Sequence, residues 1–546
     1  MSTKFFFDNK EISLPGAYST IKSVLSNSVV QANYSRVLVI DNGLGAAFGG
    51  GSGINGALAS GQDAIYRFTR LQDYQDFLKG GMLWKAAEAL FKPGRNVRGV
   101  SEVLHVRAAT TEKALMTFTA TGGGAAGGTF KFSPRDEGLI ANGVVAGVGA
   151  AMHLDKGYGY SVVTGVKDSA KWILKVWRGG WKGDHTDLIA FDEVAKADSK
   201  PILVIQSPEF DNIQTLLDWG ATQKFNEKFV LDATSAVTGL GTVTADDITA
   251  LSTYNLASGG TEVYGSTDLD SVLEAIKDVD YALLLSDEYG TTDYSSAAST
   301  KMFAHLRDDA KFMKFMVVGA GADEDDFSTS ITIADYFDSI HAIVVHGDIK
   351  KVSSKAVTGL REWPSFIHSA YIAGRIAGLE PQIPVTNKPI DVDGVAHPMT
   401  KVQKEQALES GLLCTVYNEY TGTFNVLQGV NSIQDNTRLI NADTTSHSIQ
   451  VMRIVSQINR ELVINANAEL LSGEIGGNAN TLSVGSVVNW TKNYLQSRVA
   501  TAEQDNLLLS FDNVSASRQE DAMFVNYEIR VNGEVNKIFF TGFLLA

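Results

Sequence analysis

The pattern of apolar and polar positions predicts a parallel sheet built from two separated parts of the chain. Short apolar runs occur at Arg36–Ile40, Val103–Val106, Tyr281–Leu285, Met313–Val318 and His341–Val345. Helical patterns lie between them, at residues 71–77, 83–91, about 295–309 and 330–338. Apolar strands that alternate with helices are typical of a parallel sheet covered on both faces. We therefore expect an α/β core domain formed by residues 31–110 and 261–355.

The residues between these two parts differ in character. Glycine runs at 122–124 and 127–128 precede short apolar and aromatic stretches such as Phe130–Phe132 and Trp172–Trp177. Such stretches favour short strands, and insertions are tolerated best at flexible, glycine-rich junctions. We expect residues 111–260 to form an inserted β-rich domain.

A helix with little side-chain bulk on one face is predicted over about 364–378. Pro364 suits the first turn of a helix, and Gly378 followed by Pro381 supplies its end. Ala370, Gly374 and Gly378 are four residues apart, so they share one face. Glycine within a helix costs about 1 kcal/mol against alanine, so we expect close packing of this face against a neighbouring element. An ordinary core helix with small residues is the alternative.

Residues 356–533 as a whole predict a mixed α+β domain. A short helix at 404–410 ends at Gly411, and the runs Leu412–Val416 and Thr423–Leu427 flank a turn at Gly422, which predicts a hairpin. The span His447–Leu471 predicts a long amphipathic helix. We expect its stripe of Val451, Val455, Ile458 and Leu462 to pack inward, and Arg453, Gln457, Asn459, Arg460 and Glu461 to face away. A second amphipathic helix carries Val484, Val488, Thr491 and Leu495, and an alternating strand, Phe524–Val531, leads to a hairpin signal at Asn532-Gly533.

Both ends of the chain predict strands rather than parts of a compact domain. In residues 1–30, Ile12, Leu14 and Tyr18 belong to an alternating pattern around a Pro-Gly turn. Residues 534–546 are apolar on both faces of a strand, with Ile538, Phe539, Phe540, Phe543 and Leu544. An exposed apolar strand is an aggregation edge, so we expect both segments to pair with other copies of the same chain. For the N-terminal segment, an ordinary strand paired within its own domain is the alternative.

Composition agrees with a large globular protein and disfavours nucleic-acid binding. A chain of 546 residues is longer than one hydrophobic core usually serves, so several domains are expected. Hydrophobic residues make up 44% and charged residues 20%, which is typical of a folded protein. The net charge of -16 and the absence of a basic run disfavour contacts with phosphates, so we expect no nucleic-acid partner.

The single cysteine and the apolar runs bear on the compartment. Cys414 follows Leu412 and Leu413, and we expect a buried structural thiol in a protein assembled under reducing conditions. Met1–Phe7 has too few apolar residues for a signal peptide, and no run approaches about 18 apolar residues. We expect neither secretion by that route nor a membrane span.

Two features invite an enzymatic interpretation. The strand at 36–40 leads to the run Gly49–Gly53, but a phosphate-binding loop needs a following lysine, and here Ile54 and Asn55 follow. Polar residues stand where the parallel strands end: Asp41, Asp287, Glu288, His346 and Asp348. No catalytic signature accompanies them, and loops at strand ends are normally polar. We expect no catalytic, cofactor-binding or metal-binding residues.

Several segments in a fixed order resemble one known family. They are LPGAYS at 14–19, VLHVRAAT at 103–110, EGLIANGVVAGV at 137–148, the return segment Tyr254–Ile276, and AGRIAGLEP with VTNKPI at 373–390. This order resembles the tail sheath proteins of contractile-tailed, myovirus-type bacteriophages. The resemblance implies a multidomain α/β (α+β) fold: a parallel α/β core domain, an inserted β-rich domain, a conserved C-terminal sheath domain at 356–533, and extended terminal strands at 1–30 and 534–546.

The family resemblance implies a structural role. Such a subunit polymerises as stacked hexameric rings around the tail tube and contracts to drive the tube through the host cell envelope for genome ejection. Its partners would be itself, in a helical lattice, and the tail tube, baseplate and tail terminator proteins. It would belong to the virion tail, assemble in the host cytoplasm and need no cofactor. The sheath of a phage-derived contractile injection particle, an α/β enzyme with a glycine-rich ligand loop, and a capsid or adhesin-like structural protein are the alternatives.

Overall fold

A computed structural model gives the structure of the chain. It describes residues 5–7, 10–12, 33–41, 48–49, 65–78, 81–95, 97–107, 110–111, 116–119, 129–134, 136–137, 158–168, 171–178, 202–211, 213–220, 229–231, 255–256, 262–263, 266–277, 279–286, 301, 303–306, 314–352, 360–433, 447–471, 482–501, 506–519 and 522–531.

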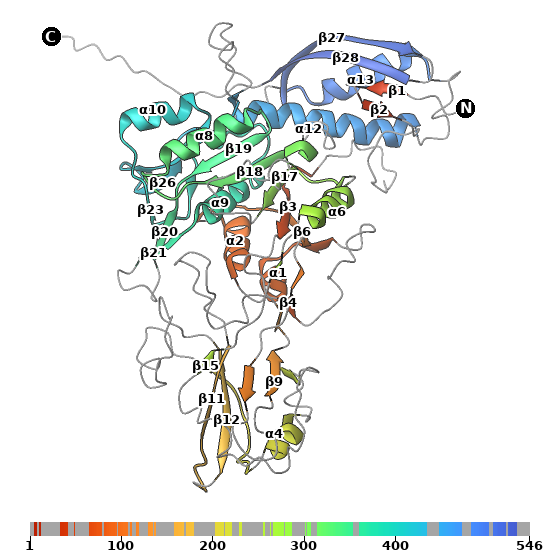
Figure 1. Cartoon of the computed structure of the whole chain (residues 1–546). Coiled ribbons are helices and arrows are strands. Elements are labelled where there is room, and N and C mark those ends of the chain that lie inside the picture. The colour runs from red at the N-terminus through yellow and green to blue at the C-terminus, as the bar shows by residue number, and fades with distance from the viewer. Residues whose placement is uncertain are drawn as a thin grey trace, which may run out of the picture.

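A seven-stranded sheet forms the centre of the fold, with the strand order β24-β19-β18-β17-β3-β6-β5 (Figure 1). The strands are β3 (Arg36–Asp41), β5 (Tyr66–Phe68), β6 (Glu102–Arg107), β17 (Leu283–Ser286), β18 (Phe315–Ala320), β19 (Ala342–His346) and β24 (Leu412–Leu413). All neighbours are parallel except β5, which runs antiparallel to β6. Leu283 of β17 pairs with Val37 on one side and Phe315 on the other. The five predicted strands are confirmed, and so is a mixed α/β fold.

Helices cover both faces of this sheet. Consecutive strand residues point to opposite sides, so each strand contributes side chains to the core on both faces. In β18, Phe315 and Val317 belong to one buried cluster, and Met316 and Val318 to the other. The first cluster includes side chains of α1 (Leu71–Leu78), α2 (Gly81–Phe91) and α9 (Ser365–Ala377). The second includes side chains of α6 (Ser266–Ile276), α8 (Phe327–Phe337) and α10 (Lys401–Glu409).

The helix α9 occupies the span predicted from Pro364 and Gly378. Pro364 precedes its first residue in an extended conformation, and every residue of α9 is buried. Its backbone approaches α2 closely: a Cβ on Gly374 would lie 2.6 Å from the carbonyl oxygens of Ala89 and Leu90. A Cβ on Gly378 would lie 1.7 Å from the carbonyl oxygen of Arg98. These glycines therefore let two segments of backbone meet without side chains between them.

The run Leu412–Val416 was predicted as one strand of a hairpin, and this is wrong for its first half. Leu412 and Leu413 form β24 and pair with β19 at the edge of the central sheet. Leu413 joins the cluster on one face of the sheet and Leu412 the cluster on the other, so both are fully buried. The hairpin itself consists of β25 (Thr415–Asn418) and β26 (Thr423–Val426), with β22 (Pro389–Ile390) beside β26.

A second small sheet stands beside this hairpin. It contains β20 (Ile349–Val352), β21 (Leu360–Trp363) and β23 (Gly394–Val395) in the order β21-β20-β23. Both α9 and β24 come from residues 356–533, yet they complete the core of the central sheet. The boundary near 355 between two domains stays a prediction.

Antiparallel strands occupy the predicted insertion. Three form one sheet, β8 (Met116–Thr119), β9 (Thr129–Pro134) and β14 (Phe229–Leu231), and four form another, β11 (Tyr158–Thr164), β12 (Trp172–Arg178), β13 (Ile202–Gln206) and β15 (Asn255–Leu256). A short helix, α4 (Ile213–Gly220), accompanies them. The strands expected around Phe130–Phe132 and Trp172–Trp177 are confirmed, whereas the limits 111 and 260 stay a prediction.

Two short strand pairs connect the core segments with residues at the edge of the predicted insertion or inside it. β7 (Thr110–Thr111) pairs with β16 (Glu262–Val263), and β4 (Phe48–Gly49) pairs with β10 (Asp136–Glu137). The first pair brings residues at the two ends of the insertion side by side.

The last described residues form a body that we call the ribbon unit: α12 (Ile449–Asn465), α13 (Val484–Ser497), β27 (Leu508–Gln519) and β28 (Ala522–Val531). A π-helical segment, η8 (Ala466–Leu471), continues α12, so the long helix predicted over 447–471 is confirmed. Figure 1 shows α12 running beside the sheet, with α13 and the two long strands on its far side. The strands of the insertion lie at the opposite end of the molecule (Figure 1).

Candidate functional site

Most residues predicted to pair with neighbouring copies lie outside the described residues. They are Leu14, Tyr18, Ile538, Phe539, Phe540, Phe543 and Leu544. Ile12 ends β2 (Lys10–Ile12), which pairs antiparallel with β1 (Phe5–Phe7), so that Ile12 stands opposite Phe5. The role of these residues in assembly stays a prediction.

The enzyme-like set at the strand ends is only partly described. Asp287, Glu288 and Gly50–Gly53 lie outside the described residues, and Asp41 ends β3. His346 ends β19 and Asp348 follows it, so these two stand at the carboxyl edge of the sheet.

His346 is held in a buried network of hydrogen bonds. Its Nδ1 lies 2.8 Å from Ser330 Oγ on α8, and its Nε2 lies 2.9 Å from His397 Nδ1. Nearby, His368 on α9 bonds to the carbonyl oxygen of Gly347 and to Thr415 Oγ1. Burial lowers the pKa of His346 to about 3 and that of His368 to about 4. Both imidazoles are therefore neutral and join elements of the fold through hydrogen bonds.

Asp348 serves the first turn of α9. Its Oδ1 accepts a hydrogen bond of 2.8 Å from the backbone N–H of Ser365, the first residue of that helix. Burial raises the pKa of Asp348 to about 7, and the acidic Glu362, Asp323 and Asp326 add to the rise. The carboxyl group thus satisfies one of the free N–H groups that every helix has at its start.

No metal site is found in the part of the chain that the structure describes, where no group of three or more His, Cys, Asp and Glu is arranged to hold an ion. Among the same residues no helix is long and apolar enough to cross a membrane. Cys414 is buried, as the sequence predicted, and burial raises the pKa of its thiol.

The polar side of α12 differs from the sequence-based expectation. Arg453, Gln457, Asn459, Arg460 and Glu461 were expected to face away from the protein. Asn459 is half-buried, and the other four are buried. Ile454 and Ile458 are buried as well, in a cluster with side chains of α13 and β27. The helix is covered on two sides, because it lies between the core on one side and α13 and β27 on the other.

Three polar side chains of α12 reach backbone carbonyls of the core, and we call these contacts the α12 joint. Gln450 Nε2 donates to the carbonyl oxygen of Gln382, and Arg453 donates to that of Leu379 at 2.6 Å. Arg460 donates to the carbonyl oxygen of Asn33 at 3.3 Å. Burial lowers the pKa of Arg453 to about 10, so its guanidinium stays charged at neutral pH.

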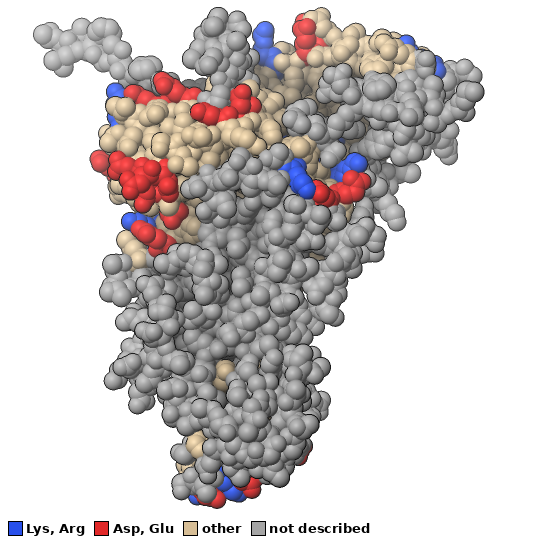
Figure 2. Space-filling model, viewed as in Figure 1, with Lys and Arg blue, Asp and Glu red and all other residues tan. Residues whose placement is uncertain are grey.

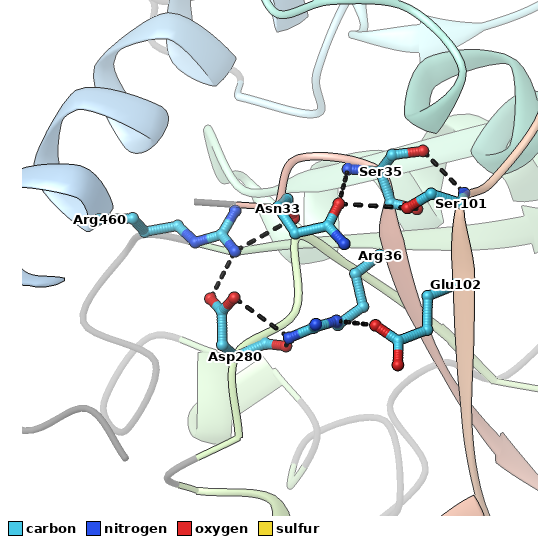
Figure 3. A network of polar contacts seen from close by, with 7 residues as sticks. All are labelled: Asn33, Ser35, Arg36, Ser101, Glu102, Asp280 and Arg460. Carbon is cyan, nitrogen blue, oxygen red and sulfur yellow. Dashed lines mark hydrogen bonds and ion pairs between the residues drawn. The ribbon is translucent and has the colours of Figure 1, made fainter. Parts of the chain in front are cut away.

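A chain of alternating charges extends the joint along the starting edge of the sheet (Figure 3). Arg460 lies 2.5 Å from Asp280 Oδ1, and Asp280 Oδ2 lies 3.3 Å from Arg36. Arg36 in turn donates to Glu102 at 2.6 Å. Arg36 and Glu102 are the first residues of the neighbouring parallel strands β3 and β6, so the parallel register brings them together.

Neutral groups support this chain. Asn33 Oδ1 accepts hydrogen bonds from the N–H of Ser35 and from Ser101 Oγ, and Ser35 Oγ accepts from the N–H of Ser101 (Figure 3). The loops before β3 and β6 are thereby fixed to each other beside the carbonyl oxygen that Arg460 contacts.

On its other side α12 is tied to α13 by Glu461. The carboxylate accepts a hydrogen bond of 2.7 Å from Tyr494 and lies 2.7 Å from the guanidinium of Arg498. Burial and the charge of Glu461 raise the pKa of Tyr494, so the phenol keeps its proton. Arg460 therefore joins α12 to the core, and its neighbour Glu461 joins α12 to α13.

A signal for this joint was present in the sequence. Gln450, Arg453, Gln457, Arg460 and Glu461 recur at spacings of three, four and seven, which is the period of a buried stripe as much as of an exposed one. The partners Asp280, Arg36 and Glu102 gave no comparable signal, because they stand singly at the starts of strands.

The described surface agrees with the acidic composition. In Figure 2, Asp and Glu side chains gather over α10. Asp323, Glu324 and Asp325 are exposed beside this helix, where Gln403 donates to Glu324. This part of the surface therefore disfavours a polyanionic ligand.

Comparison with known proteins relates the whole chain to one group. The chain is 23% identical over 587 residues to the tail sheath protein of Bacillus phage SP01, covering 97% of this chain and 95% of that protein. The solved sheath tail protein of Desulfitobacterium hafniense superimposes with a TM-score of 0.50 at 13% identity, covering 94% of this chain and 99% of that one. The sheath tail protein of Listeria innocua gives a TM-score of 0.46 at 13% identity, over 95% and 96% of the two chains. No family model matches the chain.

Proposed function

We propose that this chain, which belongs to the tail sheath protein family, is the structural subunit of a contractile phage tail sheath. The main support for this proposal is the length of the sequence match, because 97% of the chain aligns with the tail sheath protein of Bacillus phage SP01. A match of that extent includes the core, the insertion and the ribbon unit together. It supports one role for the whole chain rather than for one domain.

The proposed assembly is a helical lattice of stacked six-membered rings around the tail tube. Contraction of this lattice would drive the tube through the host envelope, and the baseplate and tail terminator proteins would bound the lattice at its ends. In this proposal the protein belongs to the virion tail and is assembled in the host cytoplasm. A phage-derived injection particle would use the same kind of subunit.

Strand exchange is the proposed connection between copies. Within the described residues β27 and β28 form a two-stranded sheet, and the first residue of β27, Leu508, also forms a bridge with Val499. Beyond that bridge, this long two-stranded ribbon has two outer edges. Exposed strand edges accept strands from other chains. The terminal segments, with Ile12, Leu14 and Tyr18 at one end and Phe539 and Phe543 at the other, are the proposed donors.

The proposed role requires neither catalysis nor a cofactor. The strand-end residues that resemble an active site already have partners inside the fold: His346 bonds to Ser330 and His397, and Asp348 accepts from Ser365. Structural hydrogen bonds of this kind favour a part in folding over a part in chemistry.

Negative-stain microscopy of the purified full-length protein tests the proposed assembly. We expect striated hollow tubes. Shells, fibrils or single chains at every protein and salt concentration tried would contradict it.

Removal of residues 534–546 tests strand exchange. Burial of each large apolar side chain is worth about 1.5–3 kcal/mol, and in this proposal that energy belongs to the interface. We therefore expect the shortened chain to keep its melting temperature and to form no tubes, since one arm is lost at every lattice contact. A shortened chain that melts many degrees lower would place the strand inside its own fold.

Point variants supply the matched comparison. Phe540→Ser with Phe543→Ser should abolish tubes, whereas Lys537→Ser in the same segment should retain them. Tubes formed equally well by both variants would rule out this segment as the connecting strand.

A further inference from the structure

Two kinds of contact meet along α12. Inside the ribbon unit the contact is apolar, because Ile454 and Ile458 pack with Tyr494, Leu495, Leu507 and Leu508. The core cluster includes Ile449 and the partly buried Met452 from the first turn of α12. Further along the helix, Arg453 and Arg460 bond to the core through their charged guanidinium groups.

Apolar and ionic contacts differ in how they control orientation. Hydrophobic burial is non-directional, so a small apolar contact at one end of α12 leaves rotation about that end open. An arginine and a carboxylate form hydrogen bonds of defined direction, and the planar guanidinium adds geometric specificity. The pair Arg460–Asp280 therefore restricts the angle at which α12 leaves the core.

The core side of this pair is itself fixed. Asp280 is shared between Arg460 and Arg36, and Arg36 also donates to the carbonyl oxygen of Asp280 at 2.9 Å. Glu102 holds Arg36 from the next strand. The side chains of Arg460 and Asp280 are 6% and 18% exposed, so water competes little for them. Any rotation of α12 would break a buried, charge-assisted contact.

Stability alone does not explain such a pair. Replacement of a buried ion pair by apolar residues of similar size is often neutral or stabilising, and the best-attested benefit of buried polar pairs is a defined register. We infer that Asp280 and Arg460 are positioning residues that hold the ribbon unit in one orientation on the α/β core. This inference rests on the proposed function in one respect, because the orientation sets where β27 and β28 present their edges to neighbouring copies.

Distance measurement within single chains tests the inference. The full-length protein would carry spin labels at Val402→Cys on α10 and Asn493→Cys on α13, which are both exposed. The native Cys414 is buried and should remain unlabelled. Dilution with unlabelled protein isolates the distance within one chain, so the result does not depend on tube formation.

The test variant is Arg460→Met with Asp280→Leu. We expect it to keep the unfolding midpoint of the parent protein while the single narrow distance distribution broadens or splits. The matched control is Lys301→Met with Asp270→Leu, which removes an ion pair of the same 2.5 Å length that is exposed on the core. The control should keep the narrow distribution.

Asp280→Asn is a second variant that preserves shape and should fold even where the double variant does not. It removes the charge that both arginines share, so it too should broaden the distribution. An unchanged narrow distribution in Asp280→Asn or in the double variant would overturn the inference, whereas a failure of the parent protein to form tubes would overturn the proposed function alone.

Discussion

The close contact between α2 and α9 makes Gly374 the most informative position for a stability test. A Cβ at this position would lie 2.6 Å from two carbonyl oxygens of α2 and 2.8 Å from the Cα of Leu90. All three atoms belong to backbone, so none can rotate away. Ordinary contact begins at about 3.4 Å, and Gly374→Ala therefore requires the two helices to separate by about 0.8 Å at this point.

Two opposing terms set the expected magnitude. Alanine is favoured over glycine within a helix by about 1 kcal/mol. Overpacking of a well-packed core costs about 1–3 kcal/mol, and a clash with backbone belongs at the upper end of that range. We expect Gly374→Ala to be destabilised by about 2 kcal/mol net. Gly374→Leu should be far worse, and Gly378→Ala should exceed Gly374→Ala because its Cβ would lie 1.7 Å from Arg98 O.

Urea unfolding followed by circular dichroism and tryptophan fluorescence measures this series. Midpoints are the quantity to compare, since a chain of this size need not unfold in two states. Gly485→Ala on the exposed side of α13 is the matched control, because its Cβ would meet only Ser483 Oγ at 3.9 Å. The control should be unchanged or slightly more stable. A midpoint for Gly374→Ala at or above that of the parent protein would show that the helices separate at no cost, which would refute the prediction.

Two further predictions follow from buried titratable groups. The folded-state pKa values of His341, His346 and His368 are lowered to about 4, 3 and 4, so at about pH 5 the unfolded chain binds nearly three protons that the folded chain does not. Asp348, with a pKa raised to about 7, acts in the opposite direction by nearly one proton. The free energy of unfolding should therefore fall with decreasing pH most steeply near pH 5, by at most about 2.7 kcal/mol per unit; midpoints that stay level from pH 6.5 to 5 would refute this. Cys414 is buried and its thiol pKa is raised, so a thiol reagent should label it only after unfolding; labelling of the native protein at the rate of a small-molecule thiol would contradict its burial.

The central sheet could be predicted from the sequence because its signal is local. Strands buried on both faces appear as runs such as Arg36–Ile40 and His341–Val345, and each run contains its own evidence. The helix α9 was predictable for the same reason, since Pro364 and Gly378 mark its ends directly. The place of Leu412-Leu413 was not, because two apolar residues fit the edge of a sheet as well as a hairpin.

The core partners in the α12 joint could not be predicted because they are distant in sequence from α12. Arg460 and Asp280 are 180 residues apart, and Arg36 and Asp280 are 244 apart. A polar stripe on a helix is usually exposed, which led to the wrong expectation for Arg453 and Glu461. The exposed interpretation fails here because α12 has a partner on each side, and a one-dimensional pattern does not reveal the second partner.

Along α12, apolar contacts hold the ribbon unit together and charged contacts orient it on the core, which suits a subunit that must assemble repeatedly without error. In the proposed lattice each copy presents its ribbon to a neighbour, so an error in the ribbon's angle would recur at every copy and accumulate along the tube. Apolar packing keeps the ribbon unit itself together, since Leu495 and Leu508 are fully buried in it. It cannot by itself select one angle against the core. The charges of Arg460, Asp280, Arg36 and Glu102 select that angle, because each lies against a partner that another partner already holds in place.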